Sequence, residues 1–167
     1  MTRDEIVTLF DYDRWATGKL LDIIGGVPDD VYRKNLGSSH GGIHGTLIHL
    51  IGACDVWLRR WQGETPTRQW KEEDFESFPV LRLQWDSYQS RLSVFLKDMT
   101  DERLNTPLFY KDMKGNPYST ALWKQMQHLV NHGSYHRGQI VTLLRILGMK
   151  AATTDLIYYY KEKEPYA

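Results

Sequence analysis

The sequence predicts an all-α protein built as a four-helix bundle. Apolar residues recur at helical spacing in four long stretches, and clusters of Gly and Pro separate the first three. Residues 108–118 instead resemble a short hairpin-like excursion before the last long helix. With 167 residues, 41% of them apolar, the chain is long enough to bury a core as a single domain over residues 1–167.

The first helix is expected at residues 3–24. Thr2 and Glu5 form the S/T-x-x-E capping-box pattern at its start, and a Gly-Gly-Val-Pro sequence follows its end. Asp13 falls inside the apolar stripe of this helix, where a carboxylate needs a partner. We expect a hydrogen-bonded core carboxylate at Asp13 in preference to a residue that supports a metal ligand.

The second helix is expected at residues 43–61, after a glycine-rich loop at 37–42. His49 lies beside its apolar stripe, and its helical neighbours are small enough to leave room for an imidazole. His40 and His44, in or next to the glycine-rich loop, are expected at the surface or at the rim of a site. Cys54 is expected to be a packed core residue. Because it is the only cysteine, no intrachain disulfide can form.

The third and fourth helices complete the bundle. The third starts near Pro79, a residue suited to a first helical turn, and the polar stretch 67–77 connects it to the second helix. The fourth spans residues 120–147, and Gly148 follows as its cap. The tail at 150–167 is expected to wrap either the bundle or a second subunit.

The charge balance argues against nucleic-acid and membrane partners. Twenty-one basic and 21 acidic residues give a net charge of zero, so the electrostatic footprint of a nucleic-acid binder is missing. No run of about 18 apolar residues could span a membrane, and the N-terminus lacks a signal-peptide pattern. We therefore expect a cytoplasmic protein that acts on a small molecule.

Histidines provide the strongest functional indication. His132 and His136 are four residues apart in the fourth helix, which puts both imidazoles on one helical face. Two ligands hold a transition metal poorly, so a third should come from another helix, and His49 is the candidate. An i,i+4 pair is also compatible with ordinary hydrogen-bonded core histidines. His128, one turn earlier, is expected beside the site rather than in it.

Four sequence blocks resemble the DinB-like (YfiT-like) metalloproteins, a family related to the bacillithiol and mycothiol S-transferases. They are FDYDRWATGKLL, HLIGACDVWLRRWQG, HGSYHRGQI and GMKAATTDLIYY, in that order along the chain. The resemblance implies up-down-down-up helix order, a homodimer, and a divalent metal held by three histidines, here His49, His132 and His136. Asp13 departs from the asparagine expected in the first block.

Three functions follow from such a site. The resemblance favours a metal-dependent S-transferase that uses a low-molecular-weight thiol in stress or detoxification chemistry. A small-molecule hydrolase is the second reading, although no carboxylate has HExxH spacing to act as a base. The third is a non-catalytic stress-response binding protein whose metal joins two helices. Zinc or nickel is expected first, and iron, manganese and cobalt are also compatible with imidazole.

Overall fold

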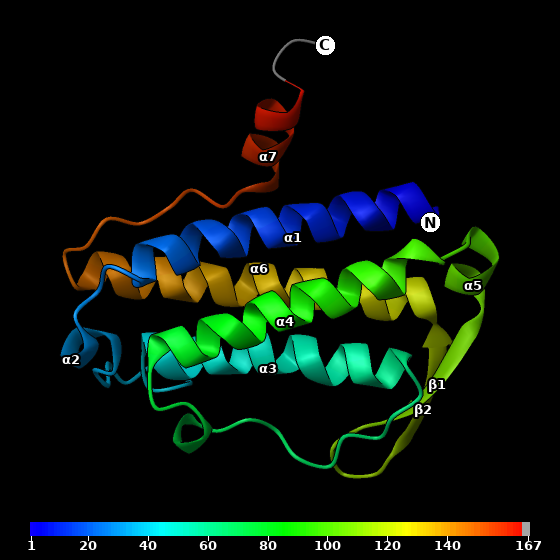
Figure 1. Ribbon diagram of the computed structural model, residues 1–167, viewed down its shortest axis with the longest axis horizontal. Coiled ribbons are helices and arrows are strands. Elements are labelled where there is room, and N and C mark those ends of the chain that lie inside the picture. The colour runs from blue at the N-terminus through cyan, green and yellow to red at the C-terminus, as the bar shows by residue number, and fades with distance from the viewer. Residues whose placement is uncertain (165–167) are drawn as a thin grey trace.

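The computed structural model describes residues 1–164, and four long helices form its body (Figure 1). They are α1 (Arg3–Ile24), α3 (Ile43–Trp61), α4 (Phe78–Lys97) and α6 (Leu122–Ile146). Each starts within two residues of the predicted position. α6 packs against both α1 and α3, and α3 also packs against α4.

Shorter elements connect these helices. α2 (Asp29–Tyr32) precedes the glycine-rich loop, and α5 (Asp101–Asn105) follows α4. The polar stretch between α3 and α4 returns along α3 and contains one 3-10 turn, η1 (Glu72–Asp74) (Figure 1). The short helices α2 and α5 were not predicted, because one helical turn produces too little periodicity to detect.

The hairpin-like excursion is confirmed as a two-stranded antiparallel sheet. β1 (Pro107–Lys111) pairs with β2 (Pro117–Ala121), with Leu108 opposite Thr120. Residues 120 and 121, predicted as the first residues of the long helix, belong to β2 instead. Ladder pairing with β1 decides this, and the backbone N–H of Leu122 then donates to the carbonyl of Thr106.

The predicted helix ends are supported by local hydrogen bonds. The Thr2 side chain accepts from the Glu5 N–H, and the Glu5 carboxylate accepts from the Thr2 N–H, so the capping box is complete. At the other end of the bundle, Gly148 follows α6 with φ of 70°, a conformation that glycine adopts without strain.

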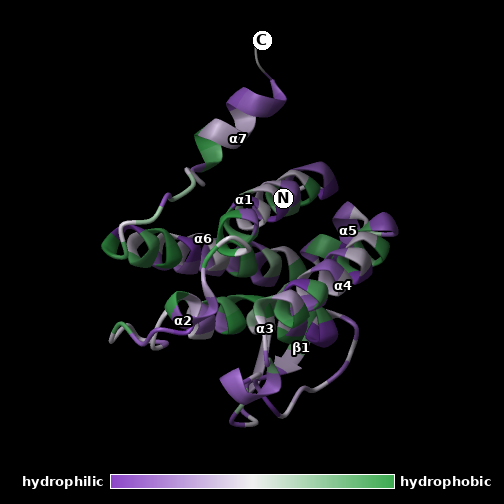
Figure 2. Cartoon of the chain, turned by 60° about the vertical axis from the view of Figure 1, so that its left-hand side comes forward, coloured by the Kyte–Doolittle hydropathy of each residue, from purple (hydrophilic) through white to green (hydrophobic). Residues whose placement is uncertain are grey.

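The core lies where the four long helices face one another. Each helix carries a hydrophobic side beside a hydrophilic one (Figure 2). The whole apolar stripe predicted for α3 is buried, including Cys54 at 2% exposure. Burial raises the pKa of the Cys54 thiol well above its usual range, so this residue packs as a small apolar group rather than reacting.

The tail adds a seventh helix, α7 (Leu156–Lys163), which packs on α1 (Figure 1). Tyr159 is its buried contact and meets Tyr12 and Trp15 edge-on. The described part of the tail therefore contacts its own bundle. Residues 165–167 of the predicted tail lie outside the described residues.

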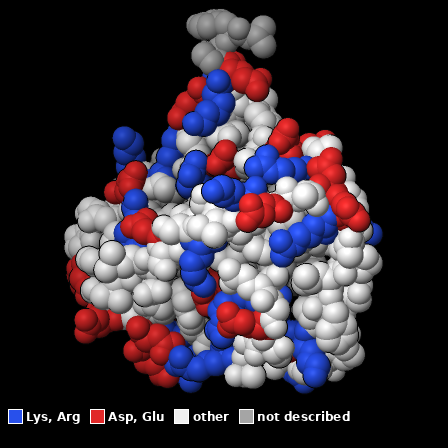
Figure 3. Space-filling view, turned by 45° about the vertical axis from the view of Figure 1, so that its right-hand side comes forward, with Lys and Arg blue, Asp and Glu red and all other residues white. Residues whose placement is uncertain are grey.

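The surface agrees with the balanced composition. On the face shown in Figure 3, acidic and basic side chains are interspersed rather than gathered by sign. Within residues 1–164, none of the helices combines the length and apolar character needed to cross a membrane.

Candidate metal centre

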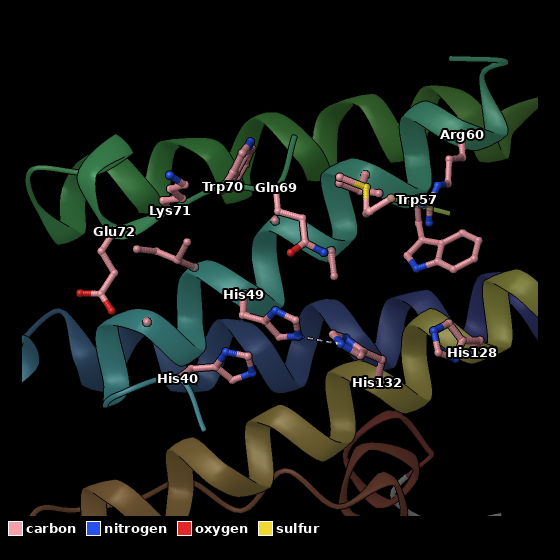
Figure 4. Close-up of a pocket in the computed structure, with 16 residues that line it drawn as sticks. His40, His49, Trp57, Arg60, Gln69, Trp70, Lys71, Glu72, His128 and His132 are labelled. Carbon is pink, nitrogen blue, oxygen red and sulfur yellow. Dashed lines mark hydrogen bonds between the residues drawn. The ribbon is translucent and has the colours of Figure 1, made fainter. Parts of the chain in front are cut away.

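Three histidines from two neighbouring helices meet at one point of the bundle. His49 comes from α3, and His132 and His136 come from successive turns of α6. The Nε2 atom of His132 lies 3.1 Å from Nε2 of His49 and 3.1 Å from Nε2 of His136. Figure 4 shows His49 and His132 pointing toward each other across the gap between the helices. The structure thus brings together the three side chains that the sequence singled out.

The spacing of these nitrogen atoms suits coordination of one ion. Bonds of about 2.0–2.1 Å to a tetrahedral metal separate two imidazole nitrogens by about 3.3–3.4 Å. The observed separations of 3.1 Å are close to that value. The Nε2 atoms of His132 and of each neighbouring histidine are therefore close enough to share one ion.

Hydrogen bonding alone leaves this histidine cluster incompletely satisfied. The Nδ1–H of His136 donates to Oε1 of Gln139 at 2.7 Å, so the Nε2 of neutral His136 keeps a free lone pair. A single N–H at Nε2 of His132 can donate a good hydrogen bond to only one of the two neighbouring Nε2 atoms, that of His49 or that of His136. The Nδ1 of His132 is buried and lacks a hydrogen-bond partner within residues 1–164. A cation that accepts the Nε2 lone pairs fits this donor set.

Burial favours the neutral, metal-binding form of these imidazoles. The pKa of His49 is lowered to about 4 and that of His132 to about 3. Burial is the largest cause of both shifts, and the neighbouring histidines add to it. Burial also lowers the pKa of His136, while the hydrogen bond to Gln139 opposes the shift. At neutral pH the three rings are therefore uncharged, as metal ligation requires.

A fourth histidine joins the cluster from the glycine-rich loop. The ring of His40 stacks on that of His49, with centroids 4.0 Å apart and planes 17° apart, and meets His136 edge-on. Single ligand atoms of His40, His49 and His136 all lie within 4.8 Å of one another, so these three could hold a metal ion. From the sequence, His40 was expected at the surface or at the rim of a site, whereas the structure places it against the cluster.

Glycines allow His40 to reach this position. Gly41 has φ of 75°, which an L side chain rarely adopts. A Cβ on Gly45, in the first turn of α3, would lie 2.1 Å from the carbonyl oxygen of His40. The loop can lie against α3 only because that position has no side chain. The glycines at positions 41, 42 and 45, which follow His40 closely in the chain, were the sequence signal for this close approach.

His44 contradicts its predicted surface position. It is 2% exposed and its ring packs against Tyr32 with centroids 4.8 Å apart. Neither ring nitrogen of His44 has a hydrogen-bond partner in the described chain. α2 covers this side of α3, and because that one-turn helix was not predicted, the burial was not either.

A cavity of about 430 Å³ opens beside the histidines. Its wall follows one face of α3, where His49, Ala53, Trp57 and Arg60 recur at helical spacing. The stretch that leads into η1 forms another part of the wall (Figure 4), and the tip of the hairpin also contributes to it. Lining residues from these segments include Gln69, Trp70, Lys71, Glu72 and Met113.

Of the aromatic rings near the histidine cluster or on the neighbouring helices, some line the cavity and others do not. Trp57 and His128 line the cavity, and their rings meet at 5.5 Å between centroids. Trp15 instead packs on α7. Tyr135 is 65% exposed, and its ring is nearly perpendicular to that of His136, with centroids 5.0 Å apart. His128 thus stands beside the cluster, as predicted.

Asp13 lies in the core and pairs with a neighbour of the cluster, Arg137. The Arg137 guanidinium donates to the Asp13 carboxylate, to Thr17 Oγ1 at 3.1 Å and to Ser134 Oγ at 2.9 Å. Asp13 and Arg137 are 3% and 0% exposed. This confirms the expectation of a core carboxylate and gives the arginine after His136 a role in joining α1 to α6.

Comparison with known proteins agrees with this architecture. A family model described as the DinB family matches residues 1–165. Protein DinB of Bacillus subtilis (strain 168) is 28% identical over 161 residues, covering 90% of this chain and 91% of that protein. A crystal structure of a DinB-like protein from Bacillus cereus ATCC 10987 has a TM-score of 0.63 and 19% identity, covering 91% of this chain and 97% of the other. The match along nearly the whole length means that the chain belongs to the DinB family.

Proposed function

We propose that this protein binds one divalent metal ion through His49, His132 and His136 and acts as a metal-dependent thiol S-transferase on a small molecule. The observation that carries the proposal is the position of His132 Nε2, 3.1 Å from the Nε2 atoms of both other histidines, beside a cavity. Zinc or nickel is the expected metal, followed by iron, manganese or cobalt, because imidazole suits them all.

The residues around the cluster support such chemistry. When bound to neutral imidazoles, a divalent cation keeps its charge and supplies the Lewis acidity that lowers the pKa of a thiol. Gln139 orients the ring of His136, and low pKa values keep His49 and His132 deprotonated. Trp57 forms an apolar part of the wall beside the cluster.

The cavity suits a small substrate together with a low-molecular-weight thiol. Its volume of about 430 Å³ lies in the lower part of the range for small-molecule sites, roughly 300–1,000 Å³. Both aromatic and charged side chains line it, which is typical of sites that orient a ligand by a few polar groups. We expect one electrophilic substrate to meet the thiol in this space.

Metal content tests the ligand assignment. Elemental mass spectrometry on untagged protein should find about one metal ion per chain, and almost none in His49→Ala, His132→Ala or His136→Ala. His128→Ala is the matched control, because it removes an imidazole one turn from His132 that lines the cavity but lies outside the cluster. Wild-type protein that stays metal-free after incubation with zinc, nickel and iron would overturn the site.

His40 needs its own variant, since it lies within ligand distance of His49 and His136. If the proposed triad is correct, His40→Ala retains metal that His132→Ala loses. Loss of metal in His40→Ala with retention in His132→Ala would replace the triad by His40, His49 and His136.

Activity tests the transferase. Metal-loaded protein should conjugate a thiol such as bacillithiol or mycothiol to members of an electrophile panel, and His132→Ala should not. Conjugation that survives in metal-free His132→Ala would reject the mechanism. Bound metal with no turnover of any electrophile, and a collapse of stability on chelation, would instead indicate the non-catalytic stress-response protein.

A hydrolase is the second candidate because a carboxylate lines the cavity after all. Glu72 reaches it from η1, although no acidic residue has HExxH spacing in the sequence. Ester or amide turnover without added thiol, abolished in Glu72→Gln, would favour hydrolysis. Turnover that requires the thiol and tolerates Glu72→Gln would favour the transferase.

The proposal extends to architecture and assembly. We infer a single domain over residues 1–167 with up-down-down-up helix order, supported by the directions of α1, α3, α4 and α6 in Figure 1. A cytoplasmic homodimer remains a prediction from the family resemblance. Light scattering on purified protein would test the dimer directly.

A further inference from the structure

Arg60 is a buried cation without a counterion. Its exposed fraction is 7%, and no carboxylate within residues 1–164 lies within ion-pair distance of it. Its Nε is buried with no hydrogen-bond partner in the same residues. The other deeply buried arginine, Arg137, has Asp13 as its partner. Burying an unpaired charge is costly, so the environment of Arg60 needs an explanation.

The surroundings of Arg60 hold it facing the cavity. Its Cζ lies 4.8 Å from the ring centroid of Trp57 and 5.2 Å from that of Tyr110, so two aromatic rings support the guanidinium. Arg60 lines the same cavity as the histidines, at the end marked by Trp57 and His128 in Figure 4. The guanidinium is thus directed at a space that a ligand can occupy.

A nearby acid does not neutralise Arg60. Asp112, in the hairpin turn, acts on it only at longer range. Both Asp112 carboxylate oxygens accept hydrogen bonds within their own turn, from the backbone of Lys114 and from the backbone and side chain of Asn116. The turn therefore occupies three of the about four acceptor sites of the Asp112 carboxylate.

From these contacts we infer that the cavity takes a molecule with a carboxylate group, which pairs with Arg60 while the reacting end lies at the histidine cluster. A guanidinium binds a carboxylate through two parallel N–H···O bonds, and the poorly hydrated, aromatic-lined position strengthens such a pair. The position of the reacting end rests on the proposed function. The new part of the inference is that the substrate or the thiol carries a carboxylate.

A matched pair of probe thiols tests the inference. The probes are 6-mercaptohexanoate and 6-mercaptohexanol, which differ only in the terminal carboxylate, and calorimetry measures their Kd with zinc-loaded protein. We expect the carboxylate to bind at least about tenfold more tightly, and this preference to disappear in Arg60→Met. Arg59→Met is the control, because Arg59 pairs with Glu64 on the outer side of the same helix.

Equal affinity of the two thiols in wild type, or a preference that survives in Arg60→Met, would overturn the inference. Urea unfolding separates binding from folding, since replacing an unpaired buried cation by Met should leave the free energy of unfolding unchanged or higher. A lower value would assign Arg60 a structural role and count against the carboxylate site.

Binding of hexanoate to metal-free protein distinguishes a failure of the proposed S-transferase from a failure of the carboxylate site at Arg60. If neither thiol binds zinc-loaded protein but hexanoate binds the metal-free form in an Arg60-dependent way, the S-transferase fails and the carboxylate site stands. If the thiols bind with no preference for the carboxylate, the metal site stands and the role of Arg60 fails.

Discussion

The Nε2 atoms of His49 and His132 lie 3.1 Å apart, although 83 residues separate the two histidines in the chain. Packing of α3 against α6 produces this approach. The position of His136 depends in turn on Gln139, one turn further along α6. The cluster therefore depends on helix packing and on a supporting hydrogen bond, and each can be perturbed separately.

Gln139→Leu should weaken metal binding about 10- to 100-fold, because His136 would lose the acceptor that fixes its ring and its tautomer. Competition with a chromophoric chelator measures the affinity. Gln127→Leu, at an exposed position of the same helix, is the control and should bind as wild type does. Equal affinity in Gln139→Leu and wild type would show that the hydrogen bond does not support the site.

Metal-free protein should lose stability as the pH falls. His49 and His132 have folded-state pKa values of about 4 and about 3, below the usual 6.5. Between the folded-state pKa and pH 6.5, each of these histidines therefore binds more protons in the unfolded chain than in the folded protein. Their contribution to the free energy of unfolding is complete above pH 6.5 and declines as the pH falls toward 4. Urea unfolding in the presence of a chelator, at several pH values from 8 to 5, measures this decline.

The double variant His49→Gln/His132→Gln isolates the cause of that pH dependence. Glutamine does not titrate, so the slope of stability against pH below 6.5 should become shallower in this variant. An unchanged slope would attribute the effect to other groups.

Asp13→Ala should destabilise the fold by about 3–5 kcal/mol, because it leaves the Arg137 charge buried without its carboxylate. Replacing both residues, as Asp13→Leu/Arg137→Met, should cost less than the single change. Urea unfolding gives both values. Metal content should be unchanged in folded Asp13→Asn, and its loss there would place Asp13 in the metal site rather than in the core.

Gly45→Ala should destabilise the protein by about 1–3 kcal/mol, since the new Cβ would lie 2.1 Å from the His40 carbonyl oxygen. The matched control is Gly18→Ala on α1, where a Cβ meets nothing within 4 Å. That change should stabilise the helix by about 0.5–1 kcal/mol. Thermal unfolding measures both, and a Gly45→Ala protein as stable as wild type would contradict the close packing of the loop.

Local patterns in the sequence were enough to place the four long helices. The capping box at Thr2 and Glu5 and the apolar stripe of α3 act over single helical turns, so they can be read without tertiary information. The pair His132 and His136 is of the same kind, because a helix alone puts both on one face.

Tertiary structure decided what meets those faces. The positions of His40 and His44 depend on how the glycine-rich loop and α2 fold back on α3, and no periodicity encodes that return. The same holds for Arg60: its helical face is visible in the sequence, but whether a carboxylate faces it depends on the hairpin and on α6. Helical faces follow from spacing along the chain, whereas partners across a cavity follow from packing between distant segments.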